Sequence, residues 1–133
     1  MKRRYVLDAG VLALYFAGRE DAREYIEAAY SGGAKVYMCE INVAEFLYNY
    51  ARVFGWDAAL ARHALVRSSP ITVVEVDERL TVEAAKLKHR HLGALSLADC
   101  YLVATAKLLK ATVVTTYENV KDLGEVHTVL LKV

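Results

Sequence analysis

The chain has 133 residues, 56% of them apolar and 25% charged, and its formal net charge is +1. This length fits one compact domain, 1–133, and the near-neutral charge excludes a strongly basic nucleic-acid coat or an acidic tail. No apolar run is long enough to span a bilayer, no signal-peptide core is present, and Cys39 and Cys100 form no C-x-x-C pair, so we expect a cytoplasmic protein without membrane contact.

Short apolar, β-branched segments alternate with longer helix-like segments along the chain. The predicted strands are 5–8, 35–39, 71–75, 112–115 and 126–131. The predicted helices are 11–16, 21–30, 43–54, 57–67, 78–91 and 97–109. This alternation is typical of an α/β domain with a central, mainly parallel sheet covered on both faces. Ligands of such sheets bind outside the carboxyl ends of the strands.

Three carboxylates stand in otherwise apolar surroundings. Asp8 ends the first predicted strand, and Glu45 and Asp99 lie in the first turns of predicted helices that should begin at the same edge of the sheet. A carboxylate is costly to desolvate unless it is paired or bound to a metal, and hard divalent cations prefer oxygen ligands. We therefore expect these three acids to form one cation site.

Each acid also has a purely structural interpretation. The pairs Asn42 with Glu45 and Ser96 with Asp99 both have the spacing of a helix capping box, which requires no metal. Asp8 could be a solvated strand end or the cap of the following helix.

The local sequence around the acids resembles the successive motifs of PIN-domain nucleases, and most closely those of VapC-type toxins. The segments that carry the resemblance are 5–8, 42–48, 95–106 and 111–116. The resemblance implies a three-layer α/β/α PIN-like fold, Mg²⁺ or Mn²⁺ held by clustered carboxylates, and endonucleolytic cleavage of RNA. It also implies that Asp8, Glu45 and Asp99 are the metal-binding and catalytic acids. An aspartyl-phosphate enzyme is disfavoured, because no second acid follows Asp8 at the spacing that phosphatases use.

Two positions depart from the family pattern. Gly10 stands where members commonly carry Ser or Thr, so a hydroxyl is missing and a looser site is expected there. Tyr117 and Asn119 stand where members carry acids, which leaves Glu118 as the nearest carboxylate and a candidate fourth catalytic residue. Glu118 either reaches the site or is solvated. Thr115 and Thr116 are available to donate hydrogen bonds to the acids or to a phosphate.

Partners follow from the same resemblance. A VapC-like chain would form a homo-oligomer such as a dimer, act on RNA, and be inhibited by a small VapB-type antitoxin. The basic stretch 86–91 is a candidate path for the RNA backbone, or else complements the dipole at a helix end. A non-catalytic PIN-like domain that binds RNA or a protein is the alternative, and the substitution at Tyr117 keeps that alternative open.

Overall fold

The computed structural model describes residues 2–133, so only the first position of the predicted domain lies outside it. Within these residues, five strands form one sheet in the order β3-β2-β1-β4-β5, and every neighbouring pair is parallel. The strands are β1 (Arg3–Leu7), β2 (Ala34–Cys39), β3 (Thr72–Val74), β4 (Thr112–Thr115) and β5 (Thr128–Leu130). The predicted parallel sheet is confirmed.

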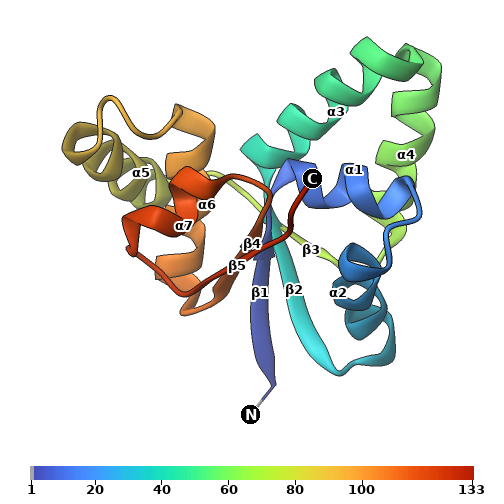
Figure 1. Cartoon of the computed structure of the whole chain (residues 1–133), viewed down its shortest axis with the longest axis horizontal. Helices are drawn as coiled ribbons and strands as arrows, with labels where there is room; N and C mark the ends of the chain where they lie inside the picture. The colour runs from blue at the N-terminus through green and yellow to red at the C-terminus, as the bar shows by residue number, and fades with distance from the viewer. Residues whose placement is uncertain (1) are drawn as a thin grey trace.

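Helices cover both faces of this sheet, as Figure 1 shows. The helices of residues 2–133 are α1 (Ala9–Phe16), α2 (Glu20–Ser31), α3 (Glu40–Phe54), α4 (Trp56–Ser68), α5 (Glu78–Arg90), α6 (Leu97–Leu109) and α7 (Glu118–Leu123). Helices α1 to α4 contribute buried side chains to one hydrophobic core, and α5 to α7 contribute theirs to a second. The arrangement is the three-layer α/β/α fold that the sequence predicts.

The central strand β1 separates the two cores. Its side chains alternate, so that Leu7 packs into the first core and Val6 into the second, each with 0% exposure. Residue Tyr5 pairs with Val36 on one side and with Thr112 on the other, which brings the ends of β1, β2 and β4 to the same edge. Asp8 follows β1 directly at this edge.

Helix α3 begins three residues earlier than predicted. Strand β2 runs straight into it, and Cys39 is the N-cap without a side-chain hydrogen bond to the helix. Asn42, the predicted cap, lies inside the first turn, where its side chain is buried and donates from Nδ2 to the backbone oxygen of Ala98 at 3.2 Å. This contact with α6 outweighs the local capping tendency, because a buried amide needs a partner.

Helix α7 was not predicted. It has only six residues, too few for a hydrophobic period to stand out, and Val120 alone is buried among them. Glu118 is its first residue rather than a loop residue.

Candidate functional site

Asp8 is buried at the end of β1, with 1% of its surface exposed. It is the N-cap residue of α1, but its side chain does not bond to the helix in the usual capping manner. Its Oδ2 instead accepts a 2.5 Å hydrogen bond from Thr115 Oγ1 at the end of β4. Burial raises the pKa of Asp8 against the opposing effect of this hydrogen bond. The solvated strand end is therefore the wrong interpretation of Asp8.

Glu45 projects from α3 toward the same edge. It is the sixth residue of that helix, so its predicted place in the first turn is wrong, and the capping box with Asn42 does not form. Burial, followed by the negative charges of Asp8 and Asp99, raises the pKa of Glu45 to about 7. At neutral pH this carboxyl group can both hold and release a proton.

Asp99 has a structural role as well as a place at the site. Ser96 caps α6, with its Oγ accepting from Asp99 N at 3.1 Å, while Asp99 Oδ2 accepts from Ser96 N at 3.2 Å. The capping-box interpretation of this pair is thus confirmed. The negative charge of Asp99 also contributes to the raised pKa of both Asp8 and Glu45, which places its carboxylate within their electrostatic reach.

Two carboxylate oxygens in this region are buried without a hydrogen-bond partner in the described part of the chain: Asp8 Oδ1 and Glu45 Oε1. Such orphaned oxygens are unfavourable in a bare protein and are suitable ligands for a hard divalent cation. The three acids do not form a closed cage, because among residues 2–133 no three His, Cys, Asp or Glu side chains meet as a ready metal site. The chemistry of the donor set fits Mg²⁺ or Mn²⁺, since Asp8 and Glu45 each present one carboxylate oxygen without a protein partner.

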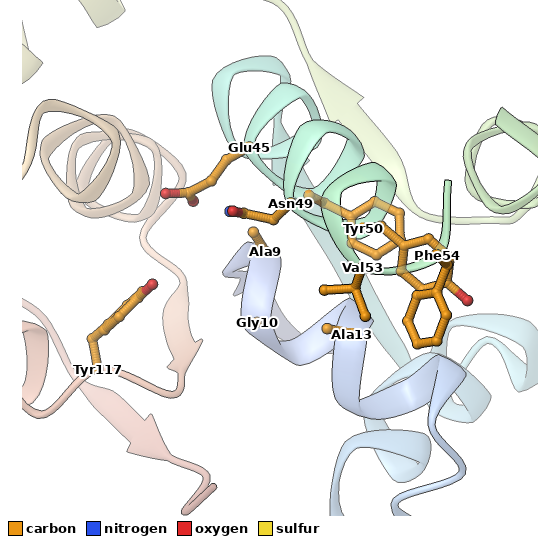
Figure 2. Close-up of a pocket in the computed structure, with 10 residues that line it drawn as sticks. Ala9, Gly10, Ala13, Glu45, Asn49, Tyr50, Val53, Phe54 and Tyr117 are labelled. Carbon is orange, nitrogen blue, oxygen red and sulfur yellow. The ribbon is translucent and has the colours of Figure 1, made fainter. Parts of the chain in front are cut away.

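Tyr117 places a phenol at the position where a fourth acid would be expected. Figure 2 shows Tyr117 reaching from the end of β4 with its hydroxyl directed toward Glu45. Burial raises the pKa of Tyr117, and the charges of Asp8, Glu45 and Asp99 raise it further. Glu118 is exposed and is not among the charges that raise the pKa of Asp8 or Glu45.

A pocket of about 210 Å³ extends from Glu45 between α1 and α3. Small residues of α1 (Ala9, Gly10 and Ala13) form one wall, and Tyr50 and Val53 of α3 form another (Figure 2). Glu45 therefore stands at one end of a mainly apolar hollow.

Gly10 does not leave the site loose, contrary to expectation. A Cβ added at Gly10 would lie 2.4 Å from Oγ1 of Thr116, so the threonine already occupies the space of a side chain at position 10.

The basic stretch 86–91 is used in part for structure. Lys88 Nζ donates to the backbone oxygens of Leu92 and Leu95, at 3.1 and 2.6 Å. Arg90 and His91 both contact the carboxylate of Glu125, at 3.3 and 2.7 Å. These three side chains hold the loop before α6, so they are poor candidates for phosphate contacts.

Sequence reasoning missed the tertiary roles of Asn42 and Tyr117. The amide of Asn42 matches a local capping pattern, and only its buried position identifies the bond to α6. Tyr117 carries no carboxylate that would have marked it as a site residue. Only the direction of its side chain in the folded protein places it at the site.

Comparison with known proteins gives a consistent family and fold. The model of the PIN domain family matches residues 5–125. No curated protein shows a significant sequence match. No helix within residues 2–133 is long and apolar enough to cross a membrane.

Solved structures resemble the chain over most of its length. VapBC2 from Rickettsia felis, bound to a promoter DNA fragment, has a TM-score of 0.77 and 14% identity, covering 95% of this chain and 97% of the other. DNA-bound VapBC from Salmonella typhimurium has a TM-score of 0.76 and 16% identity, covering 97% of this chain and 98% of the other. VapC20 from Mycobacterium tuberculosis, a toxin that cleaves the sarcin-ricin loop, has a TM-score of 0.70 and 22% identity. The match covers 91% of this chain and 95% of the other. At these identities the likeness establishes the fold.

Proposed function

The chain belongs to the PIN domain family, and on that premise we propose that it is a metal-dependent endoribonuclease whose acidic site comprises Asp8, Glu45 and Asp99. The observation that carries the proposal is the pair of buried, unpartnered oxygens of Asp8 and Glu45 at the carboxyl edge of a parallel sheet. Oxygens in this state are expected where a cation completes the site.

Asp8 and Glu45 would hold a Mg²⁺ or Mn²⁺ ion, with Asp99 as the third carboxylate. When bound, the ion supplies Lewis-acid stabilisation of the charge that develops on the phosphodiester oxygens. Thr115 fixes one oxygen of Asp8 by its hydrogen bond and leaves the other free to act as a ligand. If Glu45 does not hold the ion directly, it would act as the base that accepts a proton from the attacking water.

The biological role that we propose is that of a toxin. VapBC complexes and VapC20 share the fold of this chain, which supports a small VapB-type antitoxin as the partner. A dimeric state is expected from the resemblance to VapC-type toxins alone. A monomer that co-purifies with no partner from its native host would count against this role.

A non-catalytic PIN-like domain that binds RNA or protein is the second candidate. Two observations favour it: Tyr117 stands at the fourth acidic position, and within residues 2–133 no three-acid cluster is closed. A nuclease assay distinguishes the two candidates.

We expect the purified protein to cut RNA with Mg²⁺ or Mn²⁺ and to stop in EDTA, and Asp8→Asn or Asp99→Asn to abolish cutting. Asp99→Asn keeps an oxygen that can accept from Ser96 N, so its melting temperature (Tm) in EDTA should stay near that of the wild type. Asp99→Ala loses the hydrogen bond that its carboxylate accepts from Ser96 N, while the Ser96 cap itself remains, and this loss costs about 1 kcal/mol of stability. Glu118→Gln, at an exposed carboxylate, should retain most of the activity.

Unchanged cutting in both Asn variants would rule out the proposed site. Loss in Glu118→Gln as complete as in Asp8→Asn would show that the fourth carboxylate acts after all. RNA binding without any cutting in either metal would favour the non-catalytic alternative.

A further inference from the structure

Gly10 and Thr116 come from distant parts of the chain and share one space beside the acids. A Cβ at Gly10 would lie 2.4 Å from Thr116 Oγ1 and 3.2 Å from Thr116 Cγ2. Real Cβ atoms do not approach other atoms as closely as the first of these distances, so position 10 cannot carry a side chain while Thr116 stands where it does.

The backbone does not require glycine at this position. The glycines of residues 2–133 with positive φ are Gly18, Gly32, Gly55 and Gly124, and Gly10 lies within the first turn of α1. A glycine inside a helix costs roughly 1 kcal/mol relative to alanine. The close approach of Thr116 is therefore the physical reason for glycine at position 10.

The hydroxyl of Thr116 stands free at this point. The neighbouring Thr115 hydroxyl is engaged, because it donates to Asp8 Oδ2 and accepts from Tyr117 N at 3.1 Å. Within residues 2–133, by contrast, Thr116 Oγ1 forms no hydrogen bond, although it lies against the residue two positions after Asp8. Asp8 Oδ1 is the buried acceptor there that lacks a partner.

We propose that Thr116 is a positioning residue of the acidic site, and that positions 10 and 116 admit only one hydroxyl-bearing side chain between them. Thr116 supplies that hydroxyl from the end of β4, and it orients Asp8 through one water. This inference rests on the proposed function, because its purpose is to prepare Asp8 as a ligand. It assigns Gly10 a role as the space that Thr116 requires.

The test exchanges the hydroxyl between the two elements. Thr116→Val keeps the shape without the hydroxyl, Thr116→Ser keeps the hydroxyl, and Thr116→Ala empties the space. In Thr116→Ala, a Cβ at position 10 would be 3.4 Å from the Cβ at 116, an ordinary contact, so Gly10→Ser and Gly10→Ala can each be combined with it. Three measurements are made: Tm in EDTA, the rise in Tm with Mn²⁺, and the rate of RNA cutting.

We expect Thr116→Val to reduce Mn²⁺ affinity and cutting by roughly tenfold or more, as is usual when a group that orients a metal ligand is removed. Its Tm in EDTA should remain close to that of the wild type, and Thr116→Ser should retain both functions. Gly10→Ala alone should lower Tm in EDTA by about 5 °C through the clash.

The decisive comparison is between the two double variants. Gly10→Ser with Thr116→Ala should recover the Mn²⁺ response and cutting, whereas Gly10→Ala with Thr116→Ala should recover only the Tm in EDTA. Equal behaviour of the two would reduce the contact to packing and overturn the inference. A wild type that cuts RNA while Thr116→Val cuts equally well would overturn this inference alone. A wild type with neither cutting nor a Mn²⁺ response would overturn it together with the proposed function.

Discussion

The carboxyl groups of Asp8 and Glu45 are withdrawn from solvent at the carboxyl edge of the sheet, and burial is the main reason that the pKa of each is raised. Repulsion among the acids adds to this effect but does not dominate it. A site of this kind destabilises the folded protein at neutral pH until a cation or a proton neutralises it. Function and stability therefore oppose each other at these two residues.

Glu45 allows a direct test of this opposition. Its pKa is about 7 in the folded protein, against 4.5 for an ordinary glutamate, so the folded state holds this proton more tightly than the unfolded chain does. The free energy of unfolding should fall as the pH rises from 4.5 to about 7. In EDTA, we expect Glu45→Gln to raise Tm by about 4 °C at about pH 8 and to leave Tm unchanged at about pH 4.

Thermal melts of Glu45→Gln and wild type across this pH range make the measurement. Glu118→Gln is the matched control, since it makes the same change at an exposed carboxylate. Identical Tm values for Glu45→Gln and wild type at the higher pH would show that burial of the ionised Glu45 does not destabilise the folded protein.

At the scale of elements, Glu125 links the segment after α7 to the end of α5 and to α6. Its carboxylate contacts Arg90 and His91 at the end of α5, and Lys107 Nζ on α6 at 3.0 Å. Asn119 of α7 adds a 3.2 Å hydrogen bond from Nδ2 to the backbone oxygen of Ala94. Together these contacts hold the loop that leads to the Ser96 cap, so they fix where Asp99 stands.

We expect Glu125→Gln to lower Tm by about 3 °C at neutral pH, because three basic side chains lose a charged partner. The hydrogen bond from His91 is the main reason that the pKa of Glu125 is lowered. The stabilisation is therefore present above the ordinary glutamate pKa of 4.5 and should be lost as the pH falls below it. Glu24→Gln, on the exposed surface of α2, is the control. Equal Tm values for Glu125→Gln and wild type in low salt would show that these ion pairs contribute nothing to the fold.

At the scale of the whole molecule, one sheet joins two hydrophobic cores. Phe46 is buried in the core under α1 to α4, and Leu102 is buried in the core under α5 to α7. Both cores include side chains of β1 and β4, so neither can lose its packing without exposing the other face of the same strands. The single predicted domain should accordingly unfold as one cooperative unit.

We expect Phe46→Ala and Leu102→Ala each to lower the free energy of unfolding by about 3 kcal/mol. Each variant should still unfold in one transition, followed by far-UV circular dichroism in guanidinium and by calorimetry. Val53→Ala is the control, because Val53 is 73% exposed. Two separate transitions, with each variant shifting only one of them, would divide the molecule into independent halves.

Local sequence patterns are enough to predict the layered α/β architecture and the edge of the sheet near which Asp8, Glu45 and Asp99 lie. Strands and helices follow local periods of two and 3.6 residues, so a few neighbouring side chains identify each long element. The bounds of α6 and β4 agree with prediction because both depend on local signals, such as the Ser96 cap.

The surroundings of the acids depend on contacts that form only in the folded chain. Thr115 bonds to Asp8 across 107 positions of sequence, and Thr116 reaches Gly10 across a similar separation. Helix α3 starts early because Asn42 finds its partner on α6 rather than in its own turn. The physical reason is the same in each case: these contacts join residues that no local period relates, and they exist only after the strands have brought those residues to one edge.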